Sequence, residues 1–312
     1  MELTSLPVLS LADEPAAFSQ AIGESFRTFG FALVKDFEIA RSLIDRAWQL
    51  SEQFFALPEE EKRAYHNPAI GGARGYTPFG VEIAKDAKHH DLKEFWHIGR
   101  DLPEGSPLAD ASMPPNVWPS RPEGFREVFS ELYRQFDRTG AKILSRIAVY
   151  LGLDEHWFDP AIEDGNSVMR LLHYPPIENL AGEAIRAGAH GDINLITLLL
   201  GAEEAGLELL YQGKEWIPAN PPEGAMVINV GDMLERLTNH FLPSTIHRVR
   251  NPDPQRAAFS RYSMPFFLHL RSDWLIKTLP QCITADNPDR YPQPILADEF
   301  LQQRLREIGL KK

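Results

Sequence analysis

Residues 190–200 of the chain read HGDINLITLLL, a His-x-Asp triplet followed at once by an aliphatic run. Such a run is typical of a buried strand. In an extended backbone residues i and i+2 point to the same side, so His190 and Asp192 can reach one metal ion from a strand end. Gly191 between them permits a bend or a close approach of the backbone. The stretch therefore predicts two metal ligands at the end of a buried strand.

A third ligand is expected on a neighbouring strand, within the run STIHRV at 244–249. His247 follows His190 by 247 − 190 = 57 residues, enough for several antiparallel strands before the chain returns to the same end. Two histidines and one carboxylate occupy one face of an octahedron and leave three positions open, as in non-haem iron sites. Zinc enzymes use the same ligands, so the triad alone does not name the metal. His240 and His269 compete as third ligands.

A second His-x-Asp triplet occurs at 89–91, in a polar stretch with several lysines. We interpret this stretch as a solvated loop or the start of a helix. Glu94 and His97, spaced i and i+3, would be the further ligands if a second metal site existed there.

The composition limits the classes of partner. The chain has 312 residues, 43% hydrophobic and 24% charged, as expected of a globular protein with a sizeable core. With 32 Lys+Arg against 44 Asp+Glu, the net charge of -12 disfavours nucleic acid or an anionic membrane and favours a small molecule. No membrane span or signal peptide is evident, so a cytoplasmic protein is expected, a monomer or weak homo-oligomer. A single cysteine, Cys282, excludes an intramolecular disulfide and a thiolate-rich metal site.

Short apolar or alternating runs, separated by Pro, Gly and Asn, follow one another from Val168 onward. They cover 169–174, 195–200, 207–211, 225–230, 244–249 and 260–267. Strands at such spacing predict a sandwich or barrel of the jelly-roll type. The expected fold is therefore α+β, with a jelly-roll (double-stranded β-helix) core and a mainly helical N-terminal region packed around it.

The first half reads mainly helical. Phe18, Ile22, Phe26 and Phe29 lie on one helical face, and further helices are expected over 41–55 and 123–151, with Gly140 weakening the last. A loop-rich stretch from 67 to 122 is expected to form a binding surface or lid. We divide the chain into an N-terminal region 1–122, a core 123–285 with the iron and co-substrate sites, and a C-terminal helix within 286–312 that could act as a lid.

Arg261 and Ser263 share one face of the strand expected over 260–267. A guanidinium beside a hydroxyl suits the binding of a buried carboxylate. Taken alone, Arg261 would be better explained by a salt bridge to one of the 44 acidic residues. Because it follows the His-x-Asp triplet and the distal histidine, we interpret the pair as the binding site of a carboxylate co-substrate.

An ordered set of short motifs spans nearly the whole chain. The first half holds Leu6-Pro7-Val8, Phe29-Gly30-Phe31, Phe55-Ala56-Leu57-Pro58, Arg74-Gly75-Tyr76 and Asp91-Leu92-Lys93-Glu94. The second holds Tyr174-Pro175-Pro176, His190-Gly191-Asp192, Gly206-Leu207, Val227-Ile228-Asn229-Val230-Gly231-Asp232, Leu237-Thr238-Asn239, Ser244-Thr245-Ile246-His247-Arg248-Val249 and Arg261-Tyr262-Ser263. In these motifs the sequence resembles the isopenicillin N synthase-like branch of the 2-oxoglutarate and Fe(II)-dependent dioxygenases.

The resemblance implies iron at the mouth of the jelly roll, with Arg261, Ser263 and Tyr174 at the 2-oxoglutarate carboxylate. It also implies oxidation by O2, most simply hydroxylation, coupled to formation of succinate and CO2, with no catalytic residue beyond the metal site. Plant relatives often carry Asn where this chain has Leu172, so one co-substrate contact must be absent or replaced. Arg170 would bind a substrate carboxylate or form a surface ion pair.

The substrate is not specified by the sequence. Arg74, Tyr76 and Asn229 are the further candidates for substrate contacts. Two alternatives stay open at this point: an iron oxidase that closes a ring without 2-oxoglutarate, and a non-catalytic binding protein. Succinate formation separates the first from an oxygenase, and a lack of iron binding would establish the second.

Overall fold

An eight-stranded sheet is the main feature of the computed structural model, which describes residues 5–81, 91–109, 113–177, 186–201, 206–253 and 255–307. Its strand order is β1 (Val8–Ser10), β2 (Phe31–Lys35), β10 (Met226–Val230), β7 (Ile196–Gly201), β12 (Arg261–Leu268), β5 (Val168–Tyr174), β4 (Glu94–Gly99) and β3 (Gly75–Thr77). Neighbouring strands are antiparallel except for β1 and β2, which are parallel.

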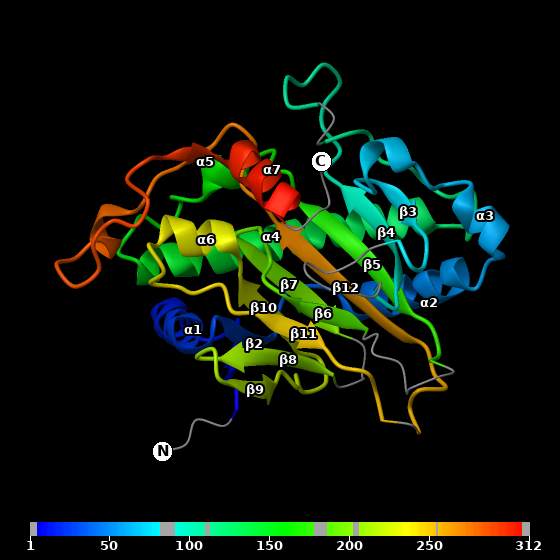
Figure 1. The fold of residues 1–312 in the computed structure, drawn as a ribbon, viewed down its shortest axis with the longest axis horizontal. Helices are drawn as coiled ribbons and strands as arrows, with labels where there is room; N and C mark the ends of the chain where they lie inside the picture. Colours follow the sequence, from blue (N-terminus) through cyan, green and yellow to red (C-terminus); the bar gives the residue numbers. More distant parts are fainter. Residues whose placement is uncertain are drawn as a thin grey trace.

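A second sheet of four strands lies in front of the large one in Figure 1. Its order is β6 (Ala187–His190), β11 (His247–Val249), β8 (Leu207–Tyr211) and β9 (Glu215–Pro218). Apolar side chains of both sheets pack together, among them Leu33 and Val227 from the large sheet and Leu209 and Val249 from the small one. Two sheets packed in this way form the predicted jelly roll, which is confirmed. The short strands β13 (Leu275–Ile276) and β14 (Ile295–Leu296) form a separate pair.

Helices cover the other face of the large sheet. The described helices are α1 (Pro15–Phe29), α2 (Arg41–Phe55), α3 (Glu59–Arg63), α4 (Phe125–Tyr150), α5 (Asp159–Ile162), α6 (Asp232–Leu237) and α7 (Ala297–Glu307). Of these, α1, α2 and α4 supply most of the apolar helix side chains in the core on that face. In Figure 1, α4 crosses behind β7 and β12, against which it packs. Two 3-10 turns lie at Pro68–Ile70 and Pro280–Cys282. Within the part of the chain that is described, no helix has the length and apolar character that a membrane span requires.

Gly140 does not interrupt α4, which runs unbroken for 26 residues. A β-carbon at Gly140 would overlap the Cδ1 atom of Leu268 on β12 and touch Leu198 on β7. The glycine therefore lets the helix approach the sheet closely, at the cost of a weaker intrinsic helix preference.

The helices predicted over 41–55 and 123–151 correspond to α2 and α4, and each of the six predicted strand runs contains a strand. The loop-rich interpretation of 67–122 was wrong at β3 and β4, because β4 is fully buried between β3 and β5. The N-terminal residues also add β1 and β2 to the large sheet, so the proposed 1–122 region is structurally continuous with the core sheet. The three-part division itself stays a prediction.

Successive residues of the large sheet alternate between two faces. The outer face, towards the helices, carries apolar side chains such as Ile196, Leu198, Met264, Phe266 and Leu268. The inner face, towards the four-stranded sheet, carries Asn229, Thr197, Arg261, Ser263, Phe267, Arg170, Tyr174 and His97. Polar side chains are thus concentrated on the inner face.

Candidate active site

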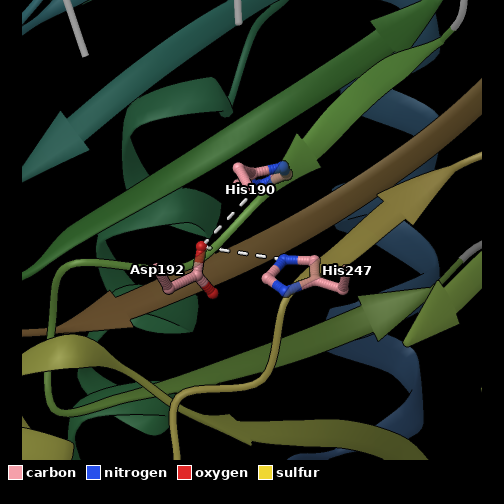
Figure 2. Close-up of side chains that lie close together, drawn as sticks. All are labelled: His190, Asp192 and His247. Carbon is pink, nitrogen blue, oxygen red and sulfur yellow. Dashed lines mark ion pairs between the residues drawn. The ribbon is translucent and has the colours of Figure 1, made fainter. Parts of the chain in front are cut away.

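Three predicted ligands meet at the inner face. His190 ends β6 and His247 begins β11, and the two are direct partners in the sheet register. Asp192 follows in the turn after β6, with its Oδ1 atom 3.9 Å from Nε2 of His190 and 3.8 Å from Nε2 of His247. Figure 2 shows the three side chains pointing towards a common centre, and one ligand atom from each lies within 4.8 Å of the others.

Backbone carbonyls orient both imidazoles. Nδ1 of His190 lies 2.7 Å from the carbonyl oxygen of Gly188, and Nδ1 of His247 lies 3.2 Å from that of Thr245. With the proton on Nδ1 donated to a carbonyl, each Nε2 keeps its lone pair for a metal ion.

Asp192 is held from the inner face of the large sheet. Its Oδ2 atom accepts hydrogen bonds from Thr197 Oγ1 at 2.5 Å and from Asn229 Nδ2 at 2.8 Å, which leaves Oδ1 directed at the imidazoles. Burial alone would raise the pKa of Asp192, but the neighbouring His247 and His190 and the two hydrogen bonds outweigh it and lower that pKa. Asn229, predicted as a substrate contact, therefore makes its described contact with a candidate metal ligand.

His190 is neutral near pH 7. Although 44% of its side chain is accessible to solvent, the surrounding protein and the neighbouring His247 lower the pKa of His190 to about 4. A neutral imidazole is the form that binds a metal ion.

No other cluster of potential ligands of this kind occurs among the described residues. Glu94 and His97 cannot share a metal ion, because they alternate to opposite faces of β4. His89 and His90 lie outside the described residues, while Asp91 forms a buried ion pair with Lys93, Oδ2 to Nζ 2.8 Å.

The competing third ligands lie elsewhere. His240 hydrogen-bonds to the Tyr291 hydroxyl at 2.6 Å. His269 continues the inner face beyond β12 but is not part of the cluster.

Further along the inner face, Arg261 is 3% exposed, and its Nε and Nη1 atoms have no hydrogen-bond partner. Its guanidinium carbon lies 5.1 Å from the centre of the Tyr174 ring, on the neighbouring strand. Ser263 is equally buried on the same face. A buried cation with two unused donors lacks an anionic partner, and a carboxylate fits that need. Leu172 pairs with Ser263 in the register and supplies no polar group.

A second arginine at this end was not predicted. Arg186 is 0% exposed and lies just before β6, with its guanidinium carbon 5.9 Å from the centre of the Tyr174 ring. Its sequence neighbourhood has no pattern that separates it from an ordinary arginine.

The remaining predicted residues divide between the two faces. Arg170 lies on the inner face and donates from Nε to Nε2 of His97 at 2.5 Å. Tyr76 lies on the outer face, where its hydroxyl contacts Glu94 and Glu59. Because Tyr76 lies on the face opposite to the triad and its hydroxyl is engaged by these two carboxylates, the structure does not support it as a substrate contact.

Two imidazole nitrogens and one carboxylate oxygen, with the remaining directions open, form a donor set that suits Fe(II). The comparisons with known proteins agree with this geometry. Residues 6–121 match a family described as non-haem dioxygenase in morphine synthesis N-terminal, and residues 165–270 match the 2OG-Fe(II) oxygenase superfamily. The 2-oxoglutarate-Fe(II) type oxidoreductase hxnY of Emericella nidulans is 33% identical over 296 residues, covering 92% of this chain and 83% of that relative.

Solved structures extend the likeness to the whole fold. A 2OG-Fe(II) oxygenase family protein from Caulobacter crescentus is 56% identical, with a TM-score of 0.91 over 98% of this chain and 100% of that one. A full-length Neurospora crassa protein, solved in complex with alpha-KG, is 28% identical, with a TM-score of 0.86 over 98% of this chain and 97% of that one. The chain therefore belongs to the isopenicillin N synthase-like branch of the 2OG-Fe(II) oxygenase superfamily and is a 2-oxoglutarate- and Fe(II)-dependent oxygenase.

Proposed function

We propose that His190, Asp192 and His247 hold Fe(II), and that Arg261 and Ser263 hold the distal carboxylate of 2-oxoglutarate beside Tyr174. When bound, iron and co-substrate supply the oxidising chemistry, in which O2 is used, 2-oxoglutarate becomes succinate and CO2, and a small molecule is oxidised. Hydroxylation is the simplest outcome for that molecule.

The chain's own residues position and shield these groups. Thr197 and Asn229 hold one oxygen of Asp192 and thereby present the other to the metal. Arg261 supplies a fixed, permanently charged fork in a buried setting, which orients a carboxylate better than a flexible ammonium would. No acid, base or nucleophile among the described residues is needed beyond these.

The observation that carries the proposal is the pairing of a buried His-Asp-His cluster with a buried arginine whose donors are unused on the same face. The His-Asp-His cluster is suited to binding a metal ion, and the buried arginine is suited to binding an anion. Relatives support a small-molecule substrate: the Neurospora crassa protein has been solved with alpha-KG and thymine. The cytoplasmic location, the monomeric or weakly associated state and the absence of a nucleic-acid partner stay predictions.

The test uses the full chain loaded with Fe(II) under anaerobic conditions. Adding 2-oxoglutarate should produce a visible charge-transfer band, because the co-substrate chelates ferrous iron; admitting air should then release succinate slowly. Protein loaded with Zn(II) is the matched control and should give neither signal. If iron-replete protein gives no band and no succinate, yet consumes O2 with another carboxylate, a ring-closing oxidase replaces this proposal.

A further inference from the structure

Arg74 is another buried arginine whose donors are not all used. Its side chain is 1% exposed, Nη1 donates to the carbonyl oxygen of Ala73 at 2.7 Å, and Nε and Nη2 have no hydrogen-bond partner. No ion pair with a described residue compensates its charge. Burial lowers the pKa of Arg74, and the nearby Tyr133 and Asp101 oppose this effect only in part. A buried guanidinium in this state calls for an acceptor from outside the chain.

The guanidinium of Arg74 lies over the inner face of the large sheet. A β-carbon built on Gly99 would overlap its atoms, and Gly99 shares its face of β4 with His97. Gly99 also lies in one row with Phe267 and Thr197 across four strands. At about 4.8 Å per strand, Gly99, over which the Arg74 guanidinium lies, is on the order of 14 Å from Thr197, the residue that holds Asp192.

Arg170 brings a second guanidinium to the same area. Its carbon lies 4.3 Å from the centre of the Phe95 ring and 5.4 Å from that of Phe267. His97 accepts from Arg170 at Nε2, while its Nδ1 lies 2.6 Å from the carbonyl oxygen of Gly72. In this arrangement Nδ1 of His97 donates to the carbonyl oxygen of Gly72, and Nε2 accepts from Arg170.

Phe267 lies between this cationic cluster and the triad. It is on β12, directly beside Thr197 on β7 and within reach of Arg170. A molecule that reached from the arginines to the triad would therefore pass over an aromatic ring.

We propose that Arg74 binds a carboxylate of the substrate that is oxidised, with Arg170 on the same face of the sheet. The substrate is then a small organic acid with a planar, apolar body that lies against Phe267, and the oxidised carbon is several bonds from the acid group. This rests on the proposed function, because it presumes that Arg261 is occupied by the co-substrate.

Arg100 is the matched control. Arg100 is the residue directly after Gly99, the last residue of β4. Unlike Arg74, it donates from both terminal nitrogens to the Asp137 carboxylate, at 2.7 and 3.0 Å. Removal of Arg100 leaves the carboxylate of Asp137 unpaired, whereas removal of Arg74 removes a cation that has no ion-pair partner among the described residues. Arg100→Met should therefore lower the melting temperature of the ligand-free protein, and Arg74→Met should leave it unchanged or raise it.

The experiment measures ligand binding to the full chain with Fe(II) and 2-oxoglutarate, without O2. Benzoate, phenylacetate and indole-3-acetate are each compared with their primary amides, with thymine as a neutral heterocycle. The readouts are the shift of the charge-transfer band and the rise in melting temperature that accompanies binding. At least one acid should bind about tenfold or more tightly than its amide, the range expected for a charge-assisted pair.

Arg74→Met should abolish that preference for acid over amide, and Arg100→Met should keep it. The inference is overturned if amides or thymine bind as well as the acids, if none of the acids binds, or if Arg74→Met keeps the preference. A melting temperature lowered in Arg74→Met as much as in Arg100→Met would assign Arg74 a structural role instead. Failure of the proposed function is distinguishable, because the parent protein would then show no band with 2-oxoglutarate alone.

Discussion

The two faces of the large sheet are built from alternate residues of the same strands, and they differ in kind. On β12, Met264 and Phe266 are fully buried against helices, whereas Arg261 and Ser263 face the four-stranded sheet. The outer face is mainly apolar and holds a hydrogen-bonded cluster, in which Glu94 accepts from Lys62 and contacts His173. On the inner face, arginine donors are left unused.

Adjacent residues of one strand therefore serve different purposes: those on the outer face stabilise the fold, and those on the inner face bind ligands. Filled, apolar contacts on the outer face contribute free energy of folding, and unmet polar groups on the inner face cost folding free energy until a ligand arrives. Substitutions on the outer face should therefore lower the free energy of unfolding, and those on the inner face should lower ligand binding. Each prediction below tests one side of that division.

The largest effect is expected at Asp192. Asp192→Ala removes the only carboxylate of the triad, so iron content and succinate formation should fall by more than about 100-fold, beyond the range for outer-shell partners. Elemental analysis and a succinate assay measure both. The metal-free variant should stay folded, losing about 1–3 kcal/mol because Thr197 and Asn229 lose their acceptor. A variant that kept its iron would show that the metal lies elsewhere.

On the outer face, a substitution at Phe266 should lower the stability of the fold without removing the iron site. Its ring is 0% exposed, stacks on Phe136 at 5.3 Å and meets Tyr133 at 5.0 Å. Phe266→Ala should lower the free energy of unfolding by about 3–5 kcal/mol, measured by denaturant titration of the metal-free protein. Below its melting temperature the variant should still bind iron and 2-oxoglutarate. Loss of iron in a fully folded variant would contradict the division between the faces.

The sequence allowed prediction of features that depend on short-range patterns. The triplet His190 to Asp192 and the aliphatic run after it are contiguous, so both the ligands and their strand were accessible. β4 was missed because Glu94 and His97 stand on either side of Phe95 and Trp96, which gives no alternation of polar and apolar residues, inside a stretch rich in Gly and Pro. Such a pattern does not distinguish a buried strand from a polar loop.

Asn229 and Arg74 were predicted only as candidate substrate contacts, and the contacts that they make within the chain could not be predicted, for a different reason. Asn229 reaches Asp192 across two paired strands, 37 residues away in the chain. Arg74 depends on the missing side chain of Gly99, which no local pattern reveals. Both contacts are consequences of strand register, which is set by the whole sheet.

An intermediate effect is expected at Arg261. Arg261→Lys keeps the charge but cannot form two parallel hydrogen bonds, so binding of 2-oxoglutarate should weaken by about 1.5–3 kcal/mol. Titration of the charge-transfer band measures this, and iron content should not change. Arg271→Lys, at an arginine paired with Asp273 on the surface, is the control and should leave binding unchanged. Unaltered saturation in Arg261→Lys would mean that this arginine serves another anion.

The smallest effect is expected at Thr197, which touches a proposed ligand without being one. Its hydroxyl donates to Asp192 Oδ2 at 2.5 Å and can accept from Asn194 Nδ2 at 3.1 Å. Thr197→Val keeps the shape and removes both bonds, so Fe(II) affinity should fall by about tenfold, the lower end of the outer-shell range. Asn229 still holds the same oxygen, which limits the loss. Thr197→Ser retains the hydroxyl and should restore affinity. If valine and serine behaved alike, the orientation of Asp192 would depend on packing alone, and the inner face would resemble the outer one more closely than we infer.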